Sequence, residues 1–191
     1  EERSYDKPVY EPLWAAAQDL RMPLSLHAAT NRAGGALSLS FTAAFSVNLD
    51  YWPRMSLASM IFSGVFERYP KLQVGSVEME LSWVPHFLDR IDYTYTQRPM
   101  EFSPYRFKGD VLPSDYFHRN VYISFQEDAV GIRLRDVIGV DCLMWGSDYP
   151  HPDGIWPDSR KLMEEDLGRL SEGVRRKITC ENAGKFYGLM N

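Results

Sequence analysis

The sequence predicts an α/β fold with parallel strands. Short apolar runs, which are typical of buried strands, alternate with longer segments whose apolar residues recur at helical spacing. A helical segment separates successive apolar runs, and parallel strands need such crossovers. The 191 residues are the length of one compact domain, so we interpret 1–191 as a single domain.

Four apolar runs are expected to form the strands: Met22–His27, Leu72–Val77, Val121–Phe125 and Cys142–Gly146. Pro23 suits the beginning of the first strand, where a missing N–H does little harm. Pro70 ends the helical segment that precedes the second strand. The beginnings of the first two strands are therefore marked by prolines.

The remaining chain divides into helices and loops by its spacing of apolar residues and prolines. Six segments are expected to be helical: Glu11–Leu20, Ser56–Tyr69, Trp83–Tyr95, Ala129–Ile138, Ser159–Leu170 and Gly173–Leu189. Three are expected to be loops: Thr30–Asp50, Thr96–Arg119 and Ser147–Pro157. The segment Thr96–Arg119 is long for a plain connection and contains three prolines, so we expect a lid or a binding loop there.

The composition excludes several partners. Lys and Arg number 21 against 26 Asp and Glu, giving a net charge of −5, so nucleic acid and anionic membrane surfaces are not expected partners. No run approaches the ~18 apolar residues of a membrane-spanning helix. The two cysteines form no Cys-x-x-Cys pair, and we expect free buried thiols in a cytoplasmic protein.

The four predicted strands end alike. Each closes with a small residue, one further residue and then a polar residue: Ser25-Leu26-His27, Ser76-Val77-Glu78, Ser124-Phe125-Gln126 and Gly146-Ser147-Asp148. The carboxyl ends of parallel strands meet at one edge of a sheet, so these polar groups are expected to converge on a pocket. Alternatively, each strand simply ends in a polar residue, but four such endings in succession favour a site.

Imidazole and carboxylate groups in one pocket suit a borderline divalent metal such as zinc. A bound metal lowers the pKa of water, and a carboxylate nearby can take the proton. Taken alone, His27 would more often be a structural histidine. Asp148 precedes Tyr149-Pro150 and would more often be a turn former.

One loop carries a specific resemblance. The run from Met144 to Pro157, which contains Gly-Ser-Asp-Tyr-Pro-His, closely resembles a signature of the amidohydrolase-related metal-dependent enzymes, in the branch of aminocarboxymuconate-semialdehyde decarboxylase. Pro23–His27, Tyr69–Glu78, Asn120–Ser124 and Asp148 resemble barrel strands five to eight of that family, and Lys177–Leu189 resembles its closing helix. The resemblance therefore implies the C-terminal half of a TIM-type (β/α)8 barrel: strands five to eight plus the terminal helices.

The resemblance also implies roles for individual residues. His27 would be a metal ligand, and Asp148 both a metal ligand and the catalytic group that handles a proton. His151 and Trp156 would contact the substrate, although His151 could equally be a plain loop histidine and Trp156 could pack the loop. Decarboxylases of this branch usually carry His where Glu78 stands. Glu78 is thus left as a catalytic base, a ligand or a substrate contact.

The family's first strand supplies a His-x-His pair, and this sequence contains none. The sequence also lacks an initiator Met, so we expect the amino-terminal half to lie outside it. Half of a barrel leaves two strand edges without partners. We therefore expect the missing half or a second copy of the chain as a partner, and a homo-oligomer.

The function expected from these residues is that of a metal-dependent hydrolase acting on a small carbonyl or carboxylate compound through metal-activated water. The first alternative is a non-oxidative decarboxylase, a carboxy-lyase on the same fold. The second, from another class, is an inactive half barrel that serves as a binding or assembly module. The expected cofactor is a divalent metal ion, with zinc as the first choice.

Overall fold

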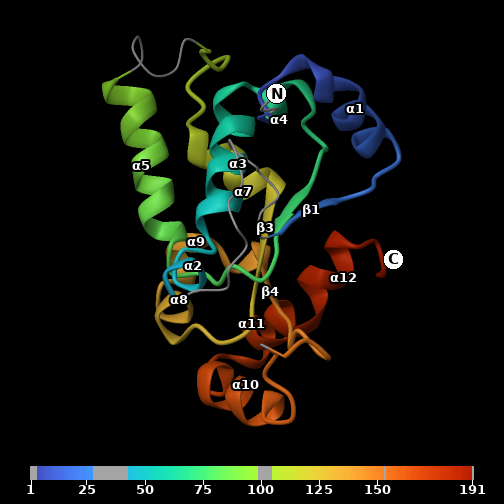
Figure 1. Ribbon diagram of the computed structural model, residues 1–191, viewed down its shortest axis with the longest axis vertical. Helices are drawn as coiled ribbons and strands as arrows, with labels where there is room; N and C mark the ends of the chain where they lie inside the picture. Colours follow the sequence, from blue (N-terminus) through green and yellow to red (C-terminus); the bar gives the residue numbers. More distant parts are fainter. Residues whose placement is uncertain (1–3, 28–42, 99–104, 153, 191) are drawn as a thin grey trace.

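The computed structural model describes residues 4–27, 43–98, 105–152 and 154–190, and its centre is a four-stranded parallel sheet (Figure 1). The strands are β1 (Leu24–Leu26), β2 (Val74–Ser76), β3 (Val121–Phe125) and β4 (Leu143–Trp145), adjacent in chain order. The register pairs Ser25 with Gly75, Gly75 with Tyr122, and Ser124 with Met144. The predicted α/β fold with parallel strands is confirmed.

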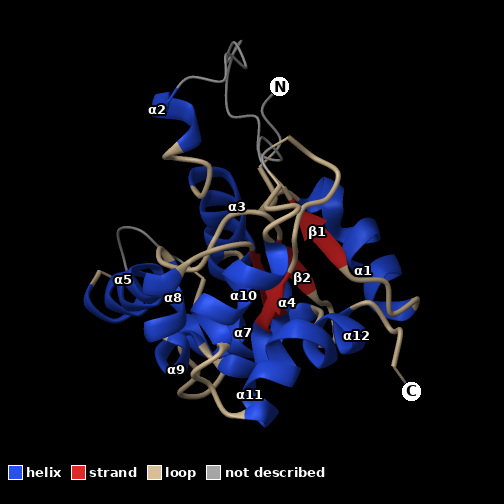
Figure 2. Cartoon of the chain, turned by 90° about the horizontal axis from the view of Figure 1, so that it is seen from below, coloured by secondary structure: helices blue, strands red, loops and turns tan. Residues whose placement is uncertain are grey.

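Helices surround the strands (Figure 2). In chain order the helical elements are η1 (Pro8–Tyr10), α1 (Glu11–Asp19), α2 (Ala43–Ser46), α3 (Tyr51–Phe62), α4 (Val65–Arg68), α5 (Val84–Gln97), α7 (Pro113–Asn120), α8 (Ala129–Arg133), α9 (Arg135–Ile138), η2 (Val140–Cys142), α10 (Ser159–Leu167), α11 (Glu172–Arg176), η3 (Lys177–Glu181) and α12 (Asn182–Phe186). Within the described ranges, no helix is both long and apolar enough to cross a lipid bilayer.

The two faces of the sheet are covered differently. Val74, Ile123 and Leu143 are fully buried in the main core, which they share with residues of α3, α5 and α7. The opposite face presents Gly75, Tyr122 and Met144, and α12 covers it (Figure 1). Alternate residues of a strand face opposite sides, which explains this division.

Phe186 of α12 is the side chain that covers this second face. It is buried, and its ring centroid lies 4.8 Å from that of Tyr122. A Cβ atom at Gly75 would lie 3.0 Å from the Phe186 ring. A side chain at position 75 would therefore require the Phe186 ring to shift, so glycine allows the ring to pack closely against the sheet.

The helix expected at Ser56–Tyr69 is in fact two helices. Helix α3 begins earlier, at Tyr51, and ends at Phe62, and α4 begins after Gly64. Gly64 has a φ of 72°, a left-handed conformation in which glycine is free of strain. The ring of Tyr105 lies where a side chain at position 64 would be, 2.2 Å from the ideal Cβ. The two helices meet at a glycine whose side-chain space is taken by that ring, and apolar spacing reveals neither feature.

Two expected loops contain helices. Helix α2 lies within Thr30–Asp50, of which residues 30–42 are outside the described part. Helix α7 begins within Thr96–Arg119 and ends one residue beyond it, at Asn120; residues 99–104 of that segment are outside the described part. Pro113 occupies the first turn of α7, and Asp115 accepts a hydrogen bond from the Leu112 N–H. The proline that we read as a loop signal therefore starts a helix.

Two expected helices are interrupted. The segment Ala129–Ile138 divides at Leu134 into α8 and α9. The segment Gly173–Leu189 consists of α11, the π-helical turn η3 and α12, which ends at Phe186. Of the two cysteines, neither of which is in a disulfide, Cys142 is buried as expected but Cys180 is exposed.

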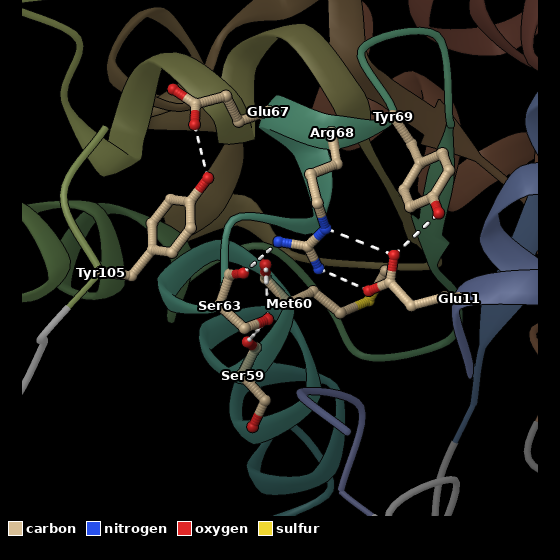
Figure 3. Close-up of polar contacts among 8 residues, drawn as sticks. All are labelled: Glu11, Ser59, Met60, Ser63, Glu67, Arg68, Tyr69 and Tyr105. Atoms are coloured by element: carbon tan, nitrogen blue, oxygen red, sulfur yellow. Dashed lines mark hydrogen bonds and ion pairs between the residues drawn. The ribbon is translucent and has the colours of Figure 1, made fainter. Parts of the chain in front are cut away.

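A polar network joins the segments that lead into β2 to helix α1 (Figure 3). The Arg68 guanidinium donates to both carboxylate oxygens of Glu11, and Tyr69 donates its hydroxyl to Glu11 at 2.7 Å. The neighbouring Glu67 accepts hydrogen bonds from the hydroxyls of Tyr105 and Tyr116. Together these bonds join α1, α4 and α7 at the amino-terminal end of the sheet.

Candidate active site

The polar residues that follow the four strands lie together at the carboxyl-terminal end of the sheet, because the strands are parallel and adjacent. His27 follows β1, Glu78 follows β2, Gln126 follows β3 and Asp148 follows β4. Glu78 and Asp148 have φ values of 60° and 55°. Such left-handed conformations are strained for residues other than glycine and are found preferentially at functional sites.

His27 and Glu78 form one pair. The distance between His27 Nε2 and Glu78 Oε2 is 2.8 Å, and the two side chains are 55% and 36% exposed. The Glu78 N–H donates to Ser124 Oγ at 2.9 Å. The serine that precedes the end of β3 thus fixes the backbone from which Glu78 projects.

Asp148 and His151 form a second pair. The distance between His151 Nδ1 and Asp148 Oδ2 is 2.8 Å, and the His151 N–H donates to the Asp148 carbonyl oxygen, also at 2.8 Å. The Asp148 side chain is only 13% exposed, whereas that of His151 is 59% exposed. The imidazole therefore lies between a mostly buried carboxylate and the solvent.

A cavity of about 290 Å³ opens at this carboxyl-terminal end of the sheet. Glu78, Gln126 and Asp148 line it, and so do the small residues Ser25, Ser124 and Gly146. Ala183 of α12 and Tyr187, just after that helix, line the same cavity. The structure thus brings Glu78 and Asp148 to one cavity, together with three of the small strand-end residues.

Other residues singled out in the sequence lie elsewhere. His27, His151 and Trp156 are not among the residues that line the cavity, although the two histidines contact residues that do. Trp156 is 66% exposed and packs edge-on against Tyr149, with ring centroids 5.6 Å apart. The described position of Trp156 therefore matches loop packing, the alternative role expected for this side chain.

Four side chains at this end of the sheet carry donor atoms of the kinds that bind divalent metals. Imidazole nitrogen and carboxylate oxygen are suitable donors, and His27, Glu78, Asp148 and His151 provide both kinds. A catalytic zinc site normally has three protein ligands. Within residues 4–27, 43–98, 105–152 and 154–190, no group of three or more His, Cys, Asp or Glu could hold a metal ion. The donor types fit a metal, and further ligands are needed to complete the site.

Sequence reasoning missed Glu80 and Tyr187. Glu80 follows Glu78 by two residues, has a φ of 55° and lines a cavity of about 340 Å³ next to the first one. Burial raises the pKa of Glu80 to about 7, and the negative charge of Asp128 adds to the effect. The Glu78-x-Glu80 spacing after a strand could have indicated this residue, whereas the place of Tyr187 depends on how the C-terminal helix packs.

Similar proteins were found by sequence. A family model described as amidohydrolase matches residues 1–189. The 2-amino-3-carboxymuconate-6-semialdehyde decarboxylase of Dictyostelium discoideum is 27% identical over 136 residues, which cover 71% of this chain and 36% of that protein. The gamma-resorcylate decarboxylase of Polaromonas sp. is 26% identical over 200 residues, covering 97% of this chain and 56% of that protein. This chain spans about half the length of such relatives, or less.

A similar fold occurs in a solved structure. The 5-carboxyvanillate decarboxylase of Sphingomonas paucimobilis superposes with a TM-score of 0.77 at 23% sequence identity, over 97% of this chain and 55% of that chain. The family match and the named relatives confirm the resemblance that the sequence indicated. From the match over residues 1–189, this chain belongs to the amidohydrolase family.

Proposed function

We propose that the chain is the C-terminal half of a TIM-type (β/α)8 barrel, comprising strands five to eight and the terminal helices. Two observations support this. The four described strands are parallel and follow one another in chain order, with β1 and β4 at the two edges of the sheet. The chain also covers 55% of a decarboxylase whose fold it matches. The other half, or a second copy in a homo-oligomer, would pair with the two edge strands.

We further propose that the complete barrel is a divalent-metal-dependent carboxy-lyase that acts on a small carboxylated compound. The main support for this proposal is the cavity that Glu78 and Asp148 line. It opens at the carboxyl-terminal ends of the strands, where enzymes with parallel barrels have their active sites. His27 and Asp148 would hold the metal, with the remaining ligands coming from the missing half. A divalent ion bound there would polarise the carboxyl group of the substrate.

Residues of this chain would then supply the proton that the reaction consumes. In a non-oxidative decarboxylation the bond between carbon and the carboxyl group breaks, carbon dioxide leaves, and the remaining carbon keeps the electron pair and takes one proton. Asp148 would deliver that proton, and His151, 2.8 Å away, would replace it from solvent. Glu78 Oε2, which lies 2.8 Å from His27 Nε2, would give up that contact when the nitrogen binds the metal.

Decarboxylation is favoured over hydrolysis by the named relatives, which are decarboxylases of carboxylated aromatic or unsaturated compounds. Hydrolysis of an amide, ester or lactone is the second candidate, and the family match to amidohydrolases favours it. Glu78 stands where the resemblance would place His in a decarboxylase, so the chemistry has to be settled by the product.

Product analysis separates the two reactions. The complete protein would be supplied with Mn²⁺ or Zn²⁺ and incubated with gamma-resorcylate and, separately, with an aryl ester. Release of carbon dioxide that is lost in Asp148→Asn supports the carboxy-lyase. Ester hydrolysis with no carbon dioxide would make the protein a hydrolase. Failure of both reactions under both metals would favour the binding or assembly module.

The half-barrel proposal has its own test. Residues 1–191 alone should bind Zn²⁺ weakly, because the described part contains too few ligands for a catalytic site. Metal analysis and calorimetric titration of the purified chain would measure this. One tightly bound zinc ion per monomeric chain would contradict the need for a second half.

A further inference from the structure

A further cavity, of about 280 Å³, lies beside the residues that precede β1 and β2. Three basic residues line it: Arg21 from the turn before β1, Lys71 from the turn before β2, and Lys185 from α12. We call it the basic cavity. It is at the amino-terminal end of the strands, and none of the described residues that line it also lines the cavity of the candidate active site.

The three cations of the basic cavity have no counter-charge. Within the described ranges, the side chains of Arg21, Lys71 and Lys185 form no hydrogen bond or ion pair. No acidic residue is among the described residues that line the cavity, although the sequence has 26 acidic residues against 21 Lys and Arg. Like charges that face one cavity repel each other, and a bound anion would turn this repulsion into attraction.

Arg21 occupies a backbone position that favours glycine. Its φ is 52°, a left-handed conformation. Its N–H donates to the Gln18 carbonyl oxygen at 3.1 Å, and the Met22 N–H donates to that of Ala17 at 2.9 Å. In a helix ending with these two bonds the left-handed residue is usually glycine, because a side chain strains the conformation. An arginine here gives up backbone stability and adds a positive charge to the cavity.

The segments that carry the cations are held together. The Lys71 N–H donates to Gln18 Oε1 at 3.0 Å, which ties the turn before β2 to the end of α1. Lys185 precedes Phe186, whose buried ring packs on the sheet and also lines the cavity. Helix dipoles favour basic residues in a last helical turn, but Lys71 lies three residues beyond the end of α4. The dipoles therefore do not account for all three cations.

The lining indicates the class of ligand. A phosphate monoester carries nearly two negative charges at neutral pH, and its oxygens accept hydrogen bonds from guanidinium and ammonium groups. A carboxylate brings only one charge to the same three cations. Met22, Pro23 and Phe186 add apolar surface to the lining, which suits an apolar part of the ligand. The volume is that of a small-molecule site.

We propose that the basic cavity binds a small phosphate monoester with an apolar body. Arg21, Lys71 and Lys185 contact the phosphate group, and Phe186 and Met22 contact the apolar body. This site is separate from the candidate active site, so the proposal does not depend on which reaction the complete protein catalyses.

The test follows methionine methyl signals by NMR in the complete protein, with phenyl phosphate as the probe at about pH 8, where the phosphate is a dianion. Met22 lines the basic cavity and Met144 lines the candidate active site, so the two signals report on the two sites separately. The Met22 signal should shift and saturate. Benzoate, with one charge, and inorganic phosphate, with no apolar body, should each bind there about fivefold more weakly.

Variants assign the binding to the named cations. Arg21→Gln should weaken the effect of phenyl phosphate on Met22 about fivefold, and Arg21→Gln combined with Lys71→Gln about 25-fold. Arg21→Gly should weaken it as Arg21→Gln does without lowering the unfolding temperature, because glycine suits the left-handed backbone. Lys161→Gln removes a cation of α10 that is 71% exposed and should behave as wild type.

Three results would overturn the proposal. The first is a Met22 signal that phenyl phosphate does not shift in the complete protein, as would happen if the other half of the barrel filled the cavity. The second is equal weakening by Arg21→Gln and Lys161→Gln, which would indicate general attraction of anions. The third is benzoate or inorganic phosphate binding as tightly as phenyl phosphate. Carbon dioxide release is measured separately, so failure of the carboxy-lyase proposal leaves these results interpretable.

Discussion

Glu11 and Glu67 at the amino-terminal end of the sheet differ from Glu80 at its carboxyl-terminal end in how well their carboxyl groups are hydrogen-bonded. At the amino-terminal end, Glu11 and Glu67 receive hydrogen bonds from arginine, tyrosine or backbone donors, and the pKa of each carboxyl group is lowered. At the carboxyl-terminal end, Glu80 has a raised pKa and an oxygen without a partner among the described residues. Satisfied networks stabilise a fold, whereas strained and incompletely bonded groups are typical of sites that await a ligand. The amino-terminal end is therefore expected to govern stability, and the carboxyl-terminal end function.

The largest effect should come from Asp148, at the functional end. Asp148→Asn removes the proton donor and one negative charge of the proposed metal site, so turnover by the complete protein should fall by roughly 10²–10⁴-fold. The unfolding temperature should change little. Carbon dioxide release and thermal unfolding would be measured side by side. Asp136→Asn, at a side chain that is 75% exposed, is the matched control and should keep full activity. Retention of most of the rate by Asp148→Asn would reject its role.

Gly64→Ala should give the largest loss of stability, at the other end. The new methyl group would meet the Tyr105 ring, and the φ of 72° is unfavourable for alanine. We expect a loss of about 2–4 kcal/mol in the free energy of unfolding, measured with urea. Gly173→Ala in α11 is the control, since nothing lies within 4 Å of its added Cβ. A similar small change in both variants would show that Tyr105 moves aside freely.

The pH dependence of the unfolding free energy should show the effect of the raised pKa of Glu80 at the carboxyl-terminal end of the sheet. The raised pKa of Glu80 means that the folded state holds a proton which the unfolded state releases near pH 4.5. The contribution of Glu80 to stability is therefore complete below about pH 4.5 and is lost as the pH rises through about 7, by about 3 kcal/mol. Glu80→Gln should flatten the curve of unfolding free energy between pH 5 and pH 8. An unchanged slope would mean that Glu80 is ionised in the folded protein.

Glu67→Gln should have the smallest effect of the four. The carboxylate of Glu67 accepts hydrogen bonds from Tyr105, Tyr116 and the Lys108 N–H, and a neutral amide accepts them more weakly. We expect a loss of about 1–2 kcal/mol in unfolding free energy with little change in activity. Glu165→Gln, on the exposed side of α10, provides the reference. A large loss of activity in a protein that is still folded would show that the two ends of the sheet are coupled.

Much of the functional end could be predicted because it depends on short local patterns. The apolar runs located the strands, and parallel strands bring their ends together, so the placement of His27, Glu78 and Asp148 at the carboxyl-terminal end of the sheet was predicted without coordinates. Glu80 was missed because its significance lies in the burial of one oxygen atom, which no spacing reveals. Tyr187 reaches the cavity only through the packing of α12 against the sheet. The break at Gly64 was missed for the same kind of reason, since the ring that requires it comes from Tyr105.

We propose that His27 and Asp148 hold one metal ion at the carboxyl-terminal end of the sheet. Anomalous diffraction at the zinc absorption edge, from crystals of the complete protein grown with Zn²⁺, would locate that ion. We expect one zinc ion bonded to His27 Nε2 and to a carboxylate oxygen of Asp148, each at about 2.0–2.2 Å. A zinc ion bound elsewhere, with His27 still paired to Glu78 and Asp148 still paired to His151, would contradict it.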